Sequence, residues 1–172
     1  HGHKWLSRQI QYFMRIYTEK MKHQKYRVLF NHIAVVIEFR EHLWIAEALG
    51  FGVRTYPIEE SGYLTNKNII IKRHRLGFSQ EQRELVTYKM LSMGGVRYQI
   101  EAFLQYVGKI WFRFKNMFIK ENERAVNCSE LGAIAINTVY PNTFKITDGI
   151  SPMDFVMDNT NFETIDNYGL LN

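Results

Sequence analysis

The sequence contains one cysteine, three prolines and no hydrophobic run long enough to cross a bilayer. A single cysteine excludes a disulfide scaffold, and the 46% hydrophobic content excludes a disordered or collagen-like chain. The longest apolar runs, residues 33–37 and 133–136, fall far short of the roughly 20 residues that a membrane-spanning helix needs. These residues also contain no recognisable signal peptide, so the sequence leaves the compartment unknown.

The 172 residues are enough to bury a hydrophobic core of their own. No internal repeat and no linker rich in Pro, Gly or Ser divides them. We therefore expect a single domain over residues 1–172.

The positive charge of the chain is unevenly distributed. The formal net charge is +5, and residues 1–27 alone carry seven Lys or Arg against a single Glu. The last nineteen residues carry four Asp or Glu and no Lys or Arg. This asymmetry is typical of a basic face that meets an anionic polymer or a membrane surface, although a solvated helix face gives the same pattern. No zinc-finger spacing, phosphate-binding glycine loop or aromatic RNA-binding motif is present, so we expect no sequence-specific binding of nucleic acid.

The N-terminal half of the chain changes from a helical to a strand pattern. Apolar residues recur every three or four positions over residues 4–23, which predicts an amphipathic helix. Val, Ile and Phe then dominate residues 28–39, and a second apolar run covers residues 43–48 after a short polar break, which predicts a β-hairpin. Residues 53–56 and 69–73 are further candidate strands. The middle of the chain is therefore predicted to form a small, mostly antiparallel sheet.

The C-terminal half carries helix-start signals. Ser79 and Gln82 form a capping box, and the helix that follows is expected to end at Gly94-Gly95. The remaining expected elements, in chain order, are a helix at residues 101–108, a buried helix at residues 131–139, a short helix capped by Ser151 and a polar surface tail at residues 158–172.

A candidate nucleophile stands at one of these helix starts. Cys128 precedes the buried helical run, and the N–H groups at a helix N-terminus lower the pKa of a thiol below that of free cysteine. His32 precedes an apolar strand and could keep the thiol ionised. Glu47, the one charged residue of its apolar segment, would lie on the neighbouring strand and orient the imidazole. Residue types and spacing thus predict a Cys-His-Glu triad.

Each of these residues also has a plainer explanation. A lone cysteine is more often a small buried hydrophobic residue than a nucleophile, and a single strand histidine is more often a satisfied core or edge residue. Glu47 fits such an explanation least well, because a carboxylate among apolar neighbours must face solvent or find a partner. The other histidines of this region, His23, His42 and His74, are expected on solvated surfaces.

Five segments follow one another in a characteristic order. They are Asn31-His32-Ile33-Ala34-Val35-Val36-Ile37, Trp44-Ile45-Ala46-Glu47-Ala48, Gly52-Val53-Arg54, Asn127-Cys128-Ser129-Glu130-Leu131 and Ile150-Ser151-Pro152-Met153-Asp154-Phe155. Together they resemble the YiiX/YaeF-like group of circularly permuted papain-like cysteine hydrolases, which are relatives of the NlpC-type cell-wall peptidases. The resemblance covers roughly residues 28–156. It implies an α+β, permuted papain-like fold in which a small antiparallel sheet packs against helices.

The resemblance implies roles for four residues. Cys128 would be the nucleophile, His32 the base and Glu47 the acid that orients the imidazole. Gly95-Val96-Arg97-Tyr98 is similar to the family's G-x-x-Y-D segment, whose Tyr lies by the active site, although Gln99 stands in place of the Asp. Tyr98 is therefore the candidate contact for the oxyanion or the substrate. This chemistry requires neither a metal ion nor an organic cofactor.

The function implied by the resemblance is cleavage of amide bonds by a thiol peptidase or amidase through an acyl-enzyme. Peptides of peptidoglycan are the candidate substrate, since a basic face would attract this acidic polymer. A lipid acyltransferase similar to lecithin–retinol acyltransferase is one alternative. It would use a second His, for which His42 is available, but its Asn-Cys-Glu-His-Phe motif is absent here. The second alternative is a non-catalytic structural or interaction protein on the same fold, such as a component of a bacteriophage particle or of the cell envelope.

Overall fold

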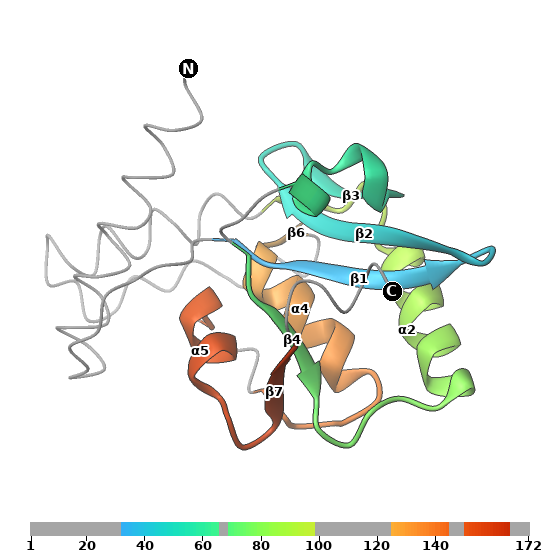
Figure 1. The fold of residues 1–172 in the computed structure, drawn as a ribbon. Helices are drawn as coiled ribbons and strands as arrows, with labels where there is room; N and C mark the ends of the chain where they lie inside the picture. Colours follow the sequence, from blue (N-terminus) through green and yellow to red (C-terminus); the bar gives the residue numbers. More distant parts are fainter. Residues whose placement is uncertain (1–31, 66–68, 99–124, 145–149, 166–172) are drawn as a thin grey trace, which may run out of the picture.

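Strands and short helices make up the part of the chain that the structure describes. The structure is a computed structural model, and it describes residues 32–65, 69–98, 125–144 and 150–165. The strands are β1 (Ala34–Phe39), β2 (His42–Leu49), β3 (Gly52–Pro57), β4 (Ile71–His74), β5 (Arg97–Tyr98), β6 (Ala125–Val126) and β7 (Phe162–Ile165). The helices are α2 (Gln80–Ser92), α4 (Cys128–Asn137) and α5 (Pro152–Met157), with the 3-10 helices η1 (Ile58–Glu60) and η2 (Tyr63–Thr65). These elements form an α+β structure, as expected (Figure 1). The expected helices at residues 4–23 and 101–108 lie outside the described residues.

The predicted hairpin forms two strands of a three-stranded antiparallel sheet in the order β1-β2-β3. Arg40 and Glu41 form the turn between β1 and β2, and both adopt the left-handed conformation, with φ of 51° and 63°. The resulting register places Ala34 opposite Glu47, and Glu47 opposite Arg54 on β3. Because residues that stand opposite each other share a face of the sheet, this register decides which side chains surround Glu47.

Gly52 lets a second chain segment approach the edge of the sheet. Its φ is +113°, and a Cβ atom at this position would lie 2.6 Å from the carbonyl oxygen of Val96. The close approach allows the N–H of Val53 to donate to that oxygen at 2.8 Å, and the N–H of Gly95 to donate to the carbonyl of Val53 at 3.0 Å. These bonds tie the segment that leads into β5 to β3.

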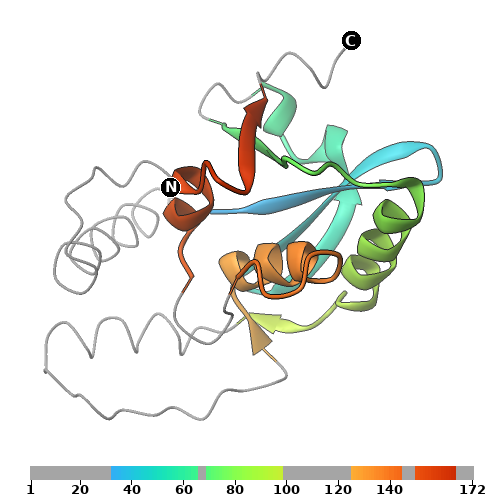
Figure 2. The same cartoon turned by 90° about the horizontal axis from the view of Figure 1, so that it is seen from below.

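Two helices cover one face of the three-stranded sheet. Figure 2 shows α2 and α4 on one side of β1–β3 and the 3-10 helices on the other. The capping box expected at the start of α2 is present: the N–H of Gln82 donates to Oγ of Ser79 at 3.3 Å, and the N–H of Ser79 donates to Oε1 of Gln82 at 2.8 Å. The buried residues between sheet and helices are Ile37, Ala46, Ala48, Val53, Val86, Met90, Val126, Cys128, Leu131 and Ala135.

The C-terminal segment differs from the sequence-based expectation. Residues 158–172 are expected to form a polar tail, but Phe162–Ile165 form β7, which pairs antiparallel with β4. Phe162 is 2% exposed, and its ring packs near those of Phe144 and Phe155. A single buried aromatic residue produces no alternation of apolar residues from which a strand could be predicted, yet its burial stabilises the strand. The prediction of a polar tail is therefore wrong for β7, and residues 166–172 lie outside the described residues.

The expectation that His74 lies on a solvated surface is also wrong. This side chain is 5% exposed, and its ring stacks on that of Tyr140 with the centroids 4.0 Å apart and an interplanar angle of 11°. The rings of Phe78 and Phe162 meet it at steeper angles. His74 ends β4, and a sequence that does not reveal the partner strand β7 cannot reveal what covers this residue. His42 is exposed as expected, and His23 lies outside the described residues.

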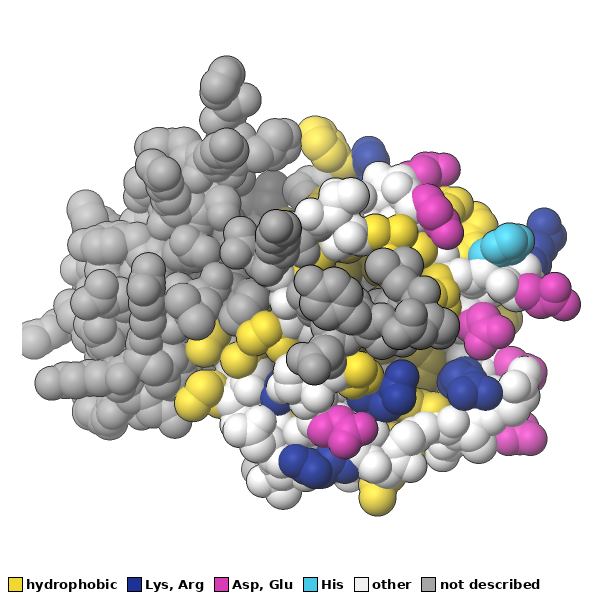
Figure 3. Space-filling view, viewed as in Figure 1, with side chains coloured by type: hydrophobic (Ala, Val, Ile, Leu, Met, Phe, Trp, Pro, Cys, Tyr) yellow, Lys and Arg dark blue, Asp and Glu magenta, His cyan; other side chains and the backbone are white. Residues whose placement is uncertain are grey.

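The surface of the described residues has no dominant charge of one sign. They contain more Asp and Glu than Lys and Arg, and both kinds of side chain are interspersed on the face shown in Figure 3. Residues 1–27 lie outside this part of the chain, so the expected basic face stays a prediction. Within the four described ranges, no helix has the length and apolar character needed to cross a membrane.

Candidate active site

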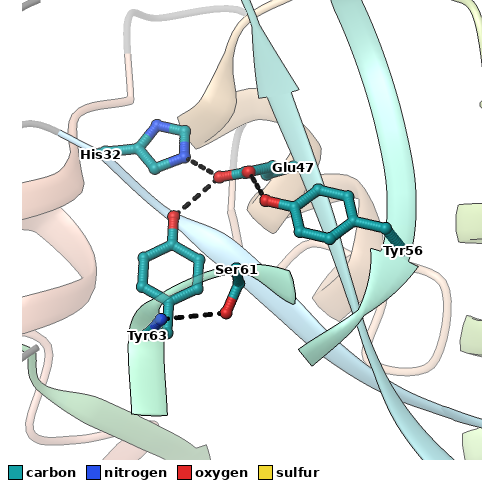
Figure 4. Close-up of polar contacts among 5 residues, drawn as sticks. All are labelled: His32, Glu47, Tyr56, Ser61 and Tyr63. Atoms are coloured by element: carbon teal, nitrogen blue, oxygen red, sulfur yellow. Dashed lines mark hydrogen bonds and ion pairs between the residues drawn. The ribbon is translucent and has the colours of Figure 1, made fainter. Parts of the chain in front are cut away.

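A hydrogen bond joins two members of the predicted triad. Nε2 of His32 lies 2.6 Å from Oε2 of Glu47 (Figure 4). His32 stands two residues before Ala34, the residue that faces Glu47 in the hairpin register, so it reaches Glu47 diagonally. The prediction that the carboxylate lies beside the imidazole is confirmed.

Cys128 stands at a helix start, as the sequence predicts, but α4 begins at Cys128 itself and ends at Asn137, whereas the expected bounds are residues 131–139. The side-chain oxygen of Asn127 accepts hydrogen bonds from the N–H groups of Ser129 and Glu130, both at 2.9 Å. The Glu130 carboxylate in turn accepts from the N–H of Asn127 at 2.9 Å, which completes a capping box. This box fixes the start of the helix at Cys128 and does not use the N–H of Cys128 itself.

A glycine lets α4 lie close to the chain that follows His32. Gly132 is one helical turn after Cys128 and therefore on the same side of α4. A Cβ atom at Gly132 would be 3.1 Å from Cζ of Phe155 and 3.2 Å from Cγ2 of Ile33. The missing side chain thus allows the approach that brings the thiol to the segment His32-Ile33.

The charges of the thiol and the imidazole stabilise each other. Burial alone would raise the pKa of Cys128, which is 6% exposed, but the hydrogen bond with His32, the imidazole charge, the N–H of Ile33 and the Ser129 side chain together lower it. Burial alone would lower the pKa of His32, but its hydrogen bonds with Cys128 and Glu47 raise it to about 10. The two pKa values move in the directions that favour a thiolate–imidazolium pair at neutral pH.

Glu47 holds the imidazole from the other side. Its side chain is buried, and burial alone would raise its pKa, but hydrogen bonds from His32, Tyr56 and Tyr63 keep the pKa of this carboxyl below its ordinary value. The carboxylate engages Nε2, which leaves Nδ1 as the ring nitrogen that Glu47 does not use. The three side chains therefore have the arrangement of a nucleophile, a base and an orienting acid.

Tyr98 is brought to the same place by a short parallel pairing. β5 runs beside β6 with Tyr98 opposite Val126, two residues before Cys128. Burial, and then the charges of Cys128 and Glu130, raise the pKa of Tyr98, so its hydroxyl keeps its proton at neutral pH. The structure thus places all four predicted site residues together.

Two further tyrosines belong to the site and are missing from the sequence-based prediction. The hydroxyl of Tyr56 donates to Oε1 of Glu47, and that of Tyr63 donates to Oε2 at 2.7 Å (Figure 4). Tyr56 had a signal: alternation along residues 53–56 puts it on the same face of the sheet as Arg54, which lies opposite Glu47. Tyr63 had none, because it follows an irregular turn.

Two other features of the described residues do not involve Cys128 or His32. His42 stands at the turn of the β1–β2 hairpin, opposite Phe39, whereas His32 is at the other end. An open hollow of about 540 Å³ beside β3 includes Arg54, Tyr56 and Glu60 in its lining but neither Cys128 nor His32. Among the residues described, no three His, Cys, Asp or Glu side chains are grouped so as to hold a metal ion.

Comparison with protein-family models, curated proteins and solved structures gives no match to this chain. What can be said of the site therefore rests on its own geometry: a buried thiol at a helix start, linked through an imidazole to a buried carboxylate.

Proposed function

We propose that the chain is a cysteine hydrolase of the circularly permuted papain-like type, similar to the YiiX/YaeF-like group, and that it cleaves amide bonds. The observation that carries the proposal is the 2.6 Å contact between His32 and the buried Glu47, together with the opposite pKa shifts that His32 and Cys128 impose on each other. A buried cysteine with a purely structural role needs neither a cationic partner nor a carboxylate behind that partner. Opposite pKa shifts on thiol and imidazole are typical of a nucleophile and its base.

The proposed reaction begins with attack of the Cys128 thiolate on the carbonyl carbon of an amide. A carbon–sulfur bond forms, and the π electrons of the carbonyl move to its oxygen. The N–H of Cys128, which the capping box leaves unused, is one donor for this oxyanion, and the hydroxyl of Tyr98 is the second.

His32 acts as the acid and then as the base. Its imidazolium donates a proton to the leaving nitrogen as the carbon–nitrogen bond breaks, which yields an amine and a thioester at Cys128. The neutral imidazole next takes a proton from water, and the hydroxide attacks the thioester. Release of the carboxylic acid restores the thiolate–imidazolium pair.

The raised pKa of His32 supports an amide substrate. At neutral pH a group with a pKa of about 10 is protonated, and an amine leaves readily only when it receives a proton. Peptides of peptidoglycan are the substrate class we propose, because residues 1–27 carry the basic charge that would attract an acidic polymer. The position of His42 at the far end of the hairpin gives no support to the acyltransferase alternative.

The test is release of amino groups from purified peptidoglycan and from a panel of peptide, lipid-amide and ester substrates. We expect release by the wild type, none by Cys128→Ala, and a covalent acyl adduct on Cys128 in the mass spectrum of the intact protein. The kcat/KM value should fall on the alkaline side near pH 10, where His32 loses its proton. Tyr88→Phe on the exposed side of α2 is the matched control.

Salt separates the contribution of the basic segment from that of the triad. Attraction of residues 1–27 to peptidoglycan should weaken as salt is raised, whereas cleavage of a short neutral peptide should not. Absence of any release that depends on Cys128, over the whole panel, would contradict the proposal and favour the non-catalytic alternative.

A further inference from the structure

The Glu47 carboxylate has more donors than orientation of an imidazole requires. Oε2 accepts from Nε2 of His32 at 2.6 Å and from the hydroxyl of Tyr63 at 2.7 Å, while Oε1 accepts from the hydroxyl of Tyr56. Glu47 is 3% exposed, so these donors replace the water that a carboxylate would otherwise hold. Figure 4 shows the two tyrosine rings approaching the carboxylate from different sides.

Each tyrosine is held in place by its own part of the fold. Tyr56 stands opposite Ile45 on β2, so it is diagonal to Glu47 on the same face. Tyr63 follows a turn in which Oγ of Ser61 donates to the carbonyl of Ile58 at 2.5 Å and accepts from the N–H of Tyr63 at 3.0 Å. The two hydroxyls are therefore positioned independently of His32.

We propose that Tyr56 and Tyr63 are positioning residues that keep Glu47 ionised and aimed at His32, and that they thereby set the lowest pH at which Cys128 reacts as a thiolate. This inference deepens the proposed function, and the role of the two tyrosines in catalysis rests on that function. The tyrosines touch neither the sulfur nor a reacting atom in this scheme. They act on the thiol through the carboxylate and the imidazole.

The hydrogen bonds around Glu47 decide whether the carboxyl or a phenol holds the proton. A buried carboxylate that lacks donors takes up a proton at a higher pH than an exposed one. Against the effect of burial, hydrogen bonds from His32 and then from Tyr56 and Tyr63 lower the pKa of Glu47. Burial, and then the bonds to Glu47, raise the pKa of both tyrosines, so the protons stay on the phenols. Without the hydroxyls, Glu47 would become protonated at a higher pH, and the imidazolium of His32 would lose its counter-charge there. The thiolate of Cys128 would then be lost at that higher pH too.

The experiment follows the alkylation of Cys128 by iodoacetamide as a function of pH. The chain has a single cysteine, so the reaction reports on this thiol alone. The variants are Tyr56→Phe, Tyr63→Phe and the double variant, each of which keeps the aromatic ring. Tyr88→Phe, at a residue that is 74% exposed on α2, is the matched control.

We expect the acid limb of the alkylation profile to move upward by about one pH unit in the double variant and by less in each single variant. Tyr88→Phe should leave it in place. In a Glu47→Gln background the tyrosine substitutions should produce no further shift, because the group through which they act is gone. A purely structural role for the rings would change thermal unfolding without moving the limb in this pattern.

Three results would overturn the inference, and they differ from one another. A wild-type profile like that of free cysteine would remove the proposed function as well. A low acid limb in the wild type that stays unchanged in the double variant would overturn only the role of the tyrosines. An equal shift in the Glu47→Gln background would show that they act by another route. If the double variant does not fold, the single variants decide the question, since each removes one donor.

Discussion

Nε2 of His32 and Oε2 of Glu47 are 2.6 Å apart although fifteen residues separate them in the sequence. The register of one hairpin is sufficient to produce this contact, because Ala34, two residues after His32, lies opposite Glu47. The thiol reaches the pair differently, from the start of a helix that is distant in sequence. The acid and base therefore belong to one local unit, and the nucleophile joins them only when α4 packs on the sheet.

Substitution Glu47→Ala should destabilise the fold. It leaves the imidazolium of His32 without its carboxylate and two tyrosine hydroxyls without their acceptor, and removal of one partner of a buried pair costs about 3 kcal/mol. Unfolding in urea measures the change in the free energy of unfolding. Glu38→Ala, an exposed carboxylate on β1, is the control and should change it by less than about 0.5 kcal/mol. Equal effects of the two substitutions would contradict the buried network.

Cys128 should react with iodoacetamide faster than free cysteine at pH 6. Free cysteine is almost fully protonated at that pH, whereas the imidazolium of His32 keeps the pKa of Cys128 low. His32→Ala should remove the advantage, and the rate should then follow the pH dependence of an ordinary thiol. A wild-type rate that His32→Ala does not change would mean that the imidazole does not control the thiol.

The elements that hold the site were accessible to sequence reasoning because each has a local signal. Two runs rich in apolar residues around a short polar break predict the hairpin, and the small apolar run that follows Cys128 predicts the helix that starts there. The conflict of Glu47 with its apolar neighbours pointed to a partner, which the hairpin register supplies. Local signals were enough for the acid and the base.

What sequence reasoning missed depends on contacts between distant segments. β4 pairs with β7 across the whole C-terminal half, so neither the strand at Phe162–Ile165 nor the burial of His74 could be read from neighbouring residues. Tyr63 reaches Glu47 only through the turn that Ser61 stabilises. Such contacts are set by tertiary packing, which overrides local preference.

His74 should make the stability of the fold depend on pH. Burial lowers its pKa, against an opposing effect of Asp158, so the folded state binds its proton less well than the unfolded state. The contribution of neutral His74 to the free energy of unfolding is complete above the unfolded pKa of about 6.5. It is lost as the pH falls below that value, and the free energy of unfolding then decreases by at most about 1.4 kcal/mol per pH unit. The pKa of His32 moves the other way, to about 10, so its contribution to stability is complete below about pH 6.5 and is lost as the pH rises from there to about 10.

Unfolding in urea at several values between pH 7 and pH 5 measures this effect. His74→Phe keeps a ring to stack on Tyr140 but has no titratable nitrogen, so its stability should fall less over this range than that of the wild type. An equal fall in both proteins would show that other groups cause the pH dependence.

Gly132→Ala should affect the thiol more than the fold. The added Cβ would lie 3.1 Å from Cζ of Phe155 and 3.2 Å from Cγ2 of Ile33, so these neighbours or α4 must move by a few tenths of an ångström. Overpacking costs about 1–3 kcal/mol, but alanine regains about 1 kcal/mol of helix propensity, so the free energy of unfolding should fall by at most about 2 kcal/mol.

The same movement separates Cys128 from the N–H of Ile33, which helps to lower the pKa of the thiol, so alkylation at pH 6 should slow several-fold. Gly50→Ala, where an added Cβ would have no atom within 4 Å beyond the adjacent residues of the chain, is the control. A folded Gly132→Ala protein with the wild-type alkylation rate would show that the close approach of α4 is not needed to activate the thiol.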